Sequence, residues 1–129
     1  MIRVFILEDN EYKLQHIIAF LKNQFSDKVV IDYCKYFNEG VRKLIKGNFD
    51  YAVLDNNLPR FNDSSTDFVT DAAEDAIEWL ELKKKDTKCI VCSSEPFELQ
   101  DYHSNYIGGV NYQYNSVAWE KQLLKLITV

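Results

Sequence analysis

Acidic side chains stand directly after two short apolar runs of the sequence. Glu8 and Asp9 follow RVFIL, and Asp55 follows YAVL. Ser93 follows a third apolar run, CIVC. If the three runs are neighbouring parallel strands, their carboxyl ends meet at one edge of a sheet and these side chains gather in one crevice. The chemistry of that crevice would then be the chemistry of three carboxylates and a hydroxyl.

Three carboxylates in one crevice need a counterion, because like charges raise each other's pKa. Mg²⁺ meets that need, since it prefers oxygen ligands and keeps several waters. A carboxylate beside such an ion can attack a phosphoryl group, because the ion neutralises the phosphoryl oxygens. Glu8, Asp9 and Asp55 therefore predict a Mg²⁺ site with phosphoryl chemistry. The alternative is that each acid is only a turn former or a helix cap.

Five short strands, alternating with helices, would position these residues. Apolar and β-branched runs predict the strands, at residues 3–7, 29–36, 51–54, 89–92 and 110–114. Apolar residues at helical spacing predict the helices, over residues 11–25 (capped by Asn10), 38–46, 71–85, 96–102 and 117–127. Such alternation indicates a parallel sheet with helices on both faces. The predicted fold is α/β: a flavodoxin-like (βα)5 three-layer sandwich with a central five-stranded parallel sheet of order 2-1-3-4-5.

Local signals mark the connections between these elements. Asp71 and Glu74 resemble a capping box at the start of the third helix. The glycine pair at residues 108–109 is typical of a turn before the last strand. The run NNLPR predicts a loop, because its proline and asparagines favour turns. Residues 60–70 then form a polar inserted loop, longer than the usual connection between a strand and a helix.

The composition limits the class of protein. The 129 residues are 47% hydrophobic and 27% charged, which is typical of one globular domain, here residues 1–129. The net charge of −5 argues against nucleic acid as a partner, since a phosphate backbone needs a basic surface. No apolar run is long enough for a membrane span, and MIRVFILEDN turns acidic too early for a signal peptide. We therefore expect a cytoplasmic protein without membrane contact.

The cysteines and histidines are assigned no site. Cys34, Cys89 and Cys92 are an odd number, which fits reduced thiols better than disulfides. Cys89 and Cys92 form a CxxC, but on a strand they point to opposite faces, which leaves metal or redox use a minor alternative. His16 and His103 have no partners at metal-ligand or triad spacing. We expect both histidines on the surface or on a helix face.

The order of the motifs resembles that of the CheY-like receiver domain of response regulators, and the resemblance covers nearly the whole chain. It rests on FILEDN, VLDNNLP and VCSS. The resemblance implies that Asp55 is the phospho-acceptor. It also implies that Glu8, Asp9, Asp55 and the backbone carbonyl of Asn57 hold Mg²⁺. By the same resemblance, the hydroxyl of Ser93 bonds a phosphoryl oxygen.

The sequence departs from that family after the last predicted strand. Family members carry a lysine followed by a proline, where this chain has Asn115 and Ser116. Asn115 at the position of the missing lysine donates only a neutral hydrogen bond, which would weaken phosphorylation or its readout. Tyr112 matches the aromatic residue that changes rotamer in the family, with plain strand packing as the alternative.

These features predict a stand-alone receiver domain in two-component phosphorelay signalling rather than a turnover enzyme. It would accept a phosphoryl group on Asp55, with Mg²⁺, from a histidine kinase or a phosphotransfer protein. It would signal through a separate output protein, as a monomer or a weak homodimer. One alternative is a pseudo-receiver that binds without phosphorylation, which Asn115 favours. The other is a receiver-like enzyme that processes cyclic phosphates, which the length of residues 60–70 suggests.

Overall fold

A central parallel sheet organises the computed structural model, which describes residues 1–62, 67–95, 97 and 103–128. Its strands are β1 (Ile2–Leu7), β2 (Val29–Cys34), β3 (Tyr51–Leu54), β6 (Lys88–Ser93) and β7 (Tyr106–Asn111). They follow the order β2-β1-β3-β6-β7, and every neighbouring pair is parallel. In chain order these strands are 2-1-3-4-5, so the predicted topology is confirmed.

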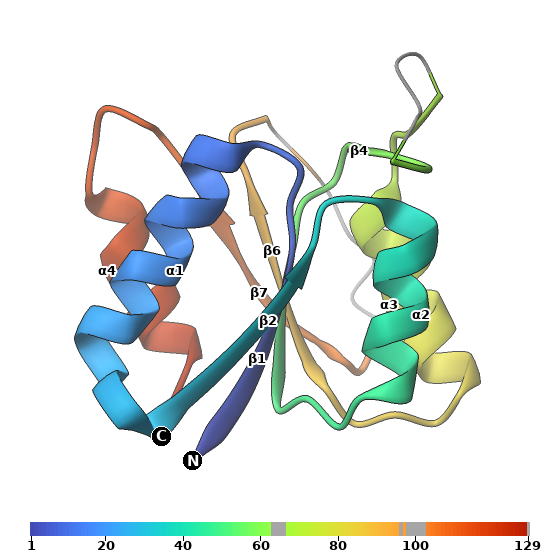
Figure 1. Cartoon of the computed structure of the whole chain (residues 1–129), viewed down its shortest axis with the longest axis horizontal. Coiled ribbons are helices and arrows are strands. Elements are labelled where there is room, and N and C mark those ends of the chain that lie inside the picture. Colours follow the sequence, from blue (N-terminus) through green and yellow to red (C-terminus); the bar gives the residue numbers. More distant parts are fainter. Residues whose placement is uncertain (63–66, 96, 98–102, 129) are drawn as a thin grey trace.

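Helices cover both faces of this sheet. They are α1 (Glu11–Phe25), α2 (Phe37–Lys46), α3 (Ala72–Leu82) and α4 (Ala118–Leu126), with a short 3-10 turn, η1 (Ser26–Lys28), before β2. Figure 1 shows α1 and α4 on one face and α2 and α3 on the other, which is the predicted three-layer sandwich. The helix predicted over residues 96–102 lies outside the described residues, apart from Phe97. None of the described helices has the length and apolar character needed to cross a bilayer.

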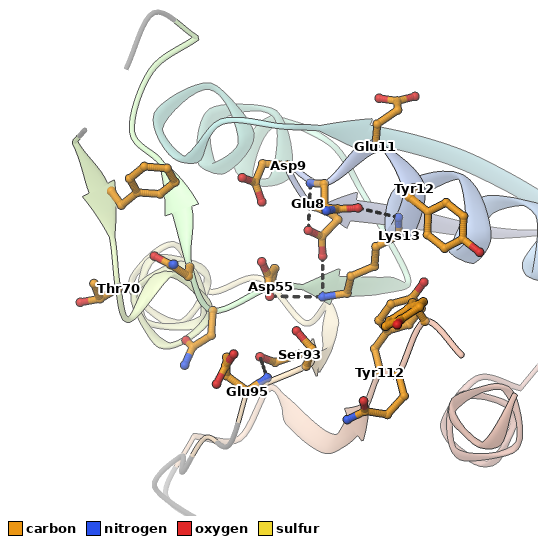
Figure 2. Close-up of a pocket in the computed structure, with 17 residues that line it drawn as sticks. Glu8, Asp9, Glu11, Tyr12, Lys13, Asp55, Thr70, Ser93, Glu95 and Tyr112 are labelled. Carbon is orange, nitrogen blue, oxygen red and sulfur yellow. Dashed lines mark hydrogen bonds and ion pairs between the residues drawn. The ribbon is translucent and has the colours of Figure 1, made fainter. Parts of the chain in front are cut away.

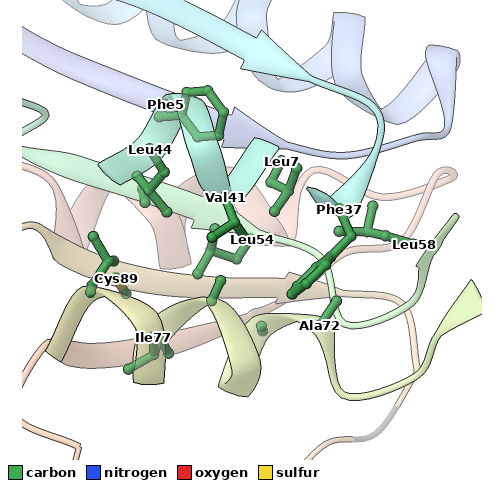
Figure 3. Close-up of a cluster of buried hydrophobic side chains, with 14 of the residues drawn as sticks. Phe5, Leu7, Phe37, Val41, Leu44, Leu54, Leu58, Ala72, Ile77 and Cys89 are labelled. Carbon is green, nitrogen blue, oxygen red and sulfur yellow. The ribbon is translucent and has the colours of Figure 1, made fainter. Parts of the chain in front are cut away.

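Each face of the sheet has its own hydrophobic core. Phe5 and Leu7 of β1 pack on the side of α2 and α3, whereas Val4 and Ile6 pack on the side of α1 and α4. All four side chains are fully buried, as expected for a central strand of a parallel sheet. Figure 3 shows the core beneath α2 and α3. Burial on both faces fixes the register of the strands, and so the place of the residues that follow them.

Cys89 and Cys92 lie in these two different cores, as the alternation of a strand predicts. Both are free thiols, and burial raises the pKa of each to about 12. A thiol that stays protonated near neutral pH is a poor nucleophile and a poor metal ligand. The CxxC of this chain is therefore part of the packing.

The last strand lies earlier in the chain than predicted. The sequence suggested a turn at the glycine pair followed by a strand over residues 110–114, but Gly108 and Gly109 lie within β7 and pair with β6. A Cβ atom on Gly108 would lie 2.8 Å from Leu126, and one on Gly109 would lie 2.4 Å from Phe97. Close packing of neighbouring side chains, rather than a turn, explains the two glycines.

A small antiparallel hairpin follows β3 where the sequence predicted a loop. Strand β4 (Leu58–Pro59) pairs with β5 (Phe68–Val69). Leu58 and Val69 are opposite one another and are buried in the core beneath α2 and α3. Hydrophobic burial thus ties both ends of the insertion to the domain, so the insertion is not a wholly polar loop. Residues 63–66, between the two strands, lie outside the described part of the chain.

His103 joins the segment before β7 to α3. It is buried there, whereas the sequence suggested a place on the surface or on a helix face. Its Nδ1 lies 3.0 Å from Oε1 of Glu81, and its Nε2 lies 3.1 Å from Oε2 of Glu74. Glu74 therefore bonds His103, and Asp71 makes no capping hydrogen bond through its side chain. Burial lowers the pKa of His103, but the hydrogen bonds and charges of the two carboxylates outweigh it and raise the pKa above its ordinary value.

We expect protonated His103 to stabilise the fold. Because its pKa is raised on folding, this contribution is complete below its ordinary pKa of 6.5 and is lost as the pH rises through the folded pKa. Urea unfolding should show a free-energy difference between wild type and His103→Gln that shrinks as the pH rises above the ordinary pKa of histidine. The difference removes the contributions of groups that titrate in both proteins. A difference that stays constant over this range would refute the prediction.

Candidate functional site

The carboxyl edge of the sheet opens into a cavity of about 1130 Å³. Glu8, Asp9, Asp55 and Ser93 line it, from the ends of β1, β3 and β6 (Figure 2). Glu8, Asp9 and Asp55 each present a carboxylate oxygen within 4.8 Å of the others. The structure thus brings together the four side chains that the sequence placed in one crevice.

The turn between β1 and α1 aims Glu8 into this cavity. The side-chain oxygen of Asn10 accepts a hydrogen bond of 2.9 Å from the backbone N–H of Lys13, so Asn10 caps α1 as predicted. The backbone N–H of Asn10 in turn donates to Oε2 of Glu8 at 3.1 Å. Glu8 is buried and Asp9 is half-buried. The start of α1 therefore places the Glu8 carboxylate deep in the cavity and the Asp9 carboxylate nearer to solvent.

A lysine of α1 lies inside this acidic cluster (Figure 2). Nζ of Lys13 is 2.6 Å from Oε1 of Glu8 and 3.3 Å from Oδ1 of Asp55. It also donates to the backbone carbonyl of Cys92 at 2.6 Å. An ammonium has three donor protons, so these three acceptors use them all. The side chain is only 7% exposed, and its Nζ lies 5.5 Å from the centre of the Tyr112 ring.

Burial and charge together shift the pKa values of the cluster. Burial raises the pKa of Glu8 to about 7, against the opposing charge of Lys13. Burial also raises the pKa of Asp9, and the charge of Asp55 raises it further. Burial lowers the pKa of Lys13, but the charges of Glu8 and Asp55 raise it more, so the net shift is upward. One ammonium therefore does not balance the three acids, and protons or a further cation must do the rest.

Sequence reasoning did not identify Lys13 as part of the site. It precedes Ile17 by one helical turn, so it shares the buried face of α1 with Ile17 and Leu21. A lysine on a buried face needs an anion close by. The acids at the end of the preceding strand supply it, and this combination is the signal that could have revealed Lys13.

The two asparagines after β3 have different surroundings. Asn57 is exposed and lines the cavity. The backbone carbonyl of Asn56 accepts a hydrogen bond of 3.2 Å from the N–H of Ala72, and its Oδ1 accepts one of 3.3 Å from the N–H of Ala73. These bonds satisfy N–H groups in the first turn of α3. Asn56 thus provides the cap that the sequence assigned to Asp71, because the chain after β3 runs across the start of α3.

Ser93 and Tyr112 lie side by side at the edge of the cavity. Oγ of Ser93 accepts a hydrogen bond of 3.1 Å from the N–H of Glu95. The backbone N–H of Tyr112 donates to the carbonyl of Ser93 at 3.0 Å. The Tyr112 hydroxyl is 2.9 Å from Nδ1 of His16, and its ring centre is 5.3 Å from that of Trp119. Tyr112 is therefore packed between α1 and α4, and a change of its rotamer stays a prediction.

Asn115 does not reach the cavity. It is exposed in the turn before α4, in a separate hollow that Tyr12 and His16 also line. The chain after β7 reaches the cavity through Tyr112 and neighbouring side chains instead. Among the described residues around the cavity, Lys13 is the only lysine or arginine.

No protein-family model matches the sequence, and no curated protein matches it. Solved structures do match the fold. The response regulator TrrA of Thermotoga maritima, solved with Mg²⁺ and beryllofluoride, is 22% identical, with a TM-score of 0.64 over 98% of this chain and 100% of that chain. The chemotaxis protein CheY4 of Vibrio cholerae is 16% identical, with a TM-score of 0.66 over 98% and 99%.

A third match is the receiver domain of the sensor histidine kinase PA1611 of Pseudomonas aeruginosa, solved with magnesium in its active-site cleft. It is 14% identical, with a TM-score of 0.65 over 97% of this chain and 96% of that chain. Identities of this size establish a fold and not an activity. The chain has the fold of the CheY-like response regulator receiver domains.

Proposed function

We propose that this chain is a receiver domain of two-component signalling, which accepts a phosphoryl group on Asp55 with the help of Mg²⁺. The observation that carries the proposal is the cluster of Glu8, Asp9 and Asp55 at the carboxyl edge of the sheet. Ligands bind at this edge in open α/β sheets. Two structural neighbours, TrrA and the PA1611 receiver domain, were solved with magnesium.

The donor set fits Mg²⁺. Glu8, Asp9 and Asp55 offer carboxylate oxygens, and a cavity of about 1130 Å³ leaves room for the waters that this ion keeps. The backbone carbonyl of Asn57 would be a fourth protein ligand, since Asn57 lines the same cavity. The ion would neutralise charge on the phosphoryl oxygens.

Asp55 is better placed than Glu8 to react. Its side chain is 14% exposed, against 3% for that of Glu8, so a phosphodonor can approach it from the cavity. Its backbone N–H donates to the carbonyl of Leu7 at 2.9 Å, which fixes its place beside β1. A carboxylate oxygen of Asp55 would bond to phosphorus while the leaving group departs with its electron pair. Ser93 would donate its hydroxyl proton to a phosphoryl oxygen from the cavity wall.

The partners belong to the same proposal. The phosphoryl group would come from a histidine kinase or a phosphotransfer protein, and one matching structure pairs TrrA with the histidine kinase ThkA. A separate output protein would then read the phosphorylated domain, which would itself be a monomer or a weak homodimer.

Phosphorylation itself is the test. Wild-type protein incubated with Mg²⁺ and acetyl phosphate should gain one phosphoryl group by intact mass spectrometry. EDTA should abolish the gain, because the charge on the phosphodonor would no longer be neutralised. A gain that persists in EDTA would argue against the metal.

A pseudo-receiver, which binds partners without phosphorylation, is the second candidate. The ammonium of Lys13 favours it, because this group already neutralises part of the negative charge of the acidic cluster without a metal ion. Absence of phosphoryl gain, together with no heat of Mg²⁺ binding in calorimetry, would favour this candidate over the first.

A further inference from the structure

We propose that Lys13 is the cationic partner of Asp55: it is the counterion of the metal-free site and then holds the phosphoryl group that Asp55 accepts. The proposal rests on the proposed function and deepens it. Among the described residues around the cavity, Lys13 is the only lysine or arginine. Asn115, at the position where the sequence suggested a missing lysine, lies in a different hollow.

The position of the ammonium is fixed by more than Asp55. Nζ of Lys13 also contacts Glu8 at 2.6 Å and the backbone carbonyl of Cys92 at 2.6 Å. The carbonyl belongs to β6, so it neither titrates nor moves with a side chain. When Asp55 carries a phosphoryl group, this carbonyl still keeps the ammonium beside it. A charge held in place beforehand stabilises an anion without the cost of reorganisation.

The surroundings also make the charge effective. The Lys13 side chain is 7% exposed, and the Tyr112 ring lies beside its Nζ at 5.5 Å. Charges interact more strongly in such a poorly hydrated place than at the surface.

In the transfer from acetyl phosphate, an oxygen of Asp55 bonds to phosphorus, the bond from phosphorus to the acetate oxygen breaks, and acetate leaves with the electron pair. Lys13 gives up no proton in this step.

One ammonium should have opposite effects on the two ligands of this cavity. It repels Mg²⁺, and it attracts the phosphoryl group. Removing the charge should therefore strengthen Mg²⁺ binding and weaken the binding of a phosphoryl mimic. A misfolded variant would bind both ligands more weakly. Opposite changes in the two affinities therefore identify the role of Lys13.

The experiment compares Lys13→Met with Lys22→Met by calorimetry. Lys22 lies on the same helix and is exposed, so its replacement removes one charge away from the cavity. Mg²⁺ should bind Lys13→Met about tenfold more tightly than wild type, or better, and beryllofluoride in saturating Mg²⁺ should bind at least about tenfold more weakly. Lys22→Met should match wild type in both. Lys13→Gln, which keeps polar hydrogen bonding, should repeat the result if Lys13→Met folds poorly.

Either affinity unchanged in the neutral variants, where wild type binds that ligand, would overturn the proposal. If wild type binds no beryllofluoride and accepts no phosphoryl group, the proposed function fails by itself. The Mg²⁺ titration then decides about Lys13 alone: tighter binding in Lys13→Met supports its place as the counterion, and equal binding overturns it.

Discussion

Replacing Asp55 with asparagine should abolish phosphoryl acceptance. The substitution keeps the size of the side chain, and its amide oxygen can still accept from Nζ of Lys13, which lies 3.3 Å from Oδ1 in the wild type. A neutral amide, however, is no nucleophile toward phosphorus, so no acyl phosphate forms. After incubation with Mg²⁺ and acetyl phosphate, the intact mass of Asp55→Asn should be unchanged.

Asp32→Asn is the matched control. Asp32 is exposed on the edge strand β2, and its Oδ1 accepts a hydrogen bond of 2.8 Å from the N–H of Tyr33, which an asparagine can keep. This variant should gain a phosphoryl group as wild type does. Equal gains by Asp55→Asn and wild type would mean that another residue is the acceptor.

Replacing Leu54 with alanine should cost about 3 to 4 kcal/mol of stability, since truncating a buried leucine removes apolar contacts and leaves a cavity. Leu54 is fully buried in the core beneath α2 and α3, directly before Asp55. The expected loss is smaller than the total stability of most domains, so the variant should still fold. Urea unfolding followed by tryptophan fluorescence measures the change, since Trp119 is 2% exposed and enters water on unfolding.

Leu82→Ala tests whether burial is the cause. The Leu82 side chain is 68% exposed at the end of α3, so its truncation should change the unfolding free energy by less than about 0.5 kcal/mol. Similar losses for Leu54→Ala and Leu82→Ala would rule out burial as the origin of the effect.

The inner strands β1, β3 and β6 could be predicted because they are buried on both faces and are therefore continuous apolar runs. YAVL, for example, is predicted as residues 51–54 and is found as Tyr51–Leu54. β7 was misplaced because Gly108 and Gly109 have a sequence pattern typical of turns, whereas their reason lies in the side chains packed over them. The hairpin of β4 and β5 was missed because strands of two residues have no readable period.

The acids of the candidate site could be placed from sequence because parallel strands end at one edge of the sheet. The contacts of His103 could not, since its partners come from an element far away in the chain. For Lys13 the acids just before it are a local signal, but its other partners also lie far away in the chain. Lys13 contacts Asp55 and the carbonyl of Cys92, and His103 contacts two glutamates of α3. Contacts of this kind depend on three-dimensional packing, which no local pattern contains.

The strand pairing of the sheet also determines when the acidic cavity can exist during folding. Within the central sheet, the loop closed by pairing β6 with β7 is the shortest, since Cys89 pairs with Tyr106. The pairings of β1 with β3 and of β3 with β6 close longer loops, since Val4 pairs with Tyr51 and Tyr51 pairs with Lys88. Longer closures lose more chain entropy before their contacts form, and they slow folding. Asp55 follows β3 and Cys92 belongs to β6, so their contacts with Lys13, which follows β1, need the pairing of β1 with β3 and of β3 with β6. A partly folded chain that has formed only the short closure therefore has no cavity in which to bind a cation.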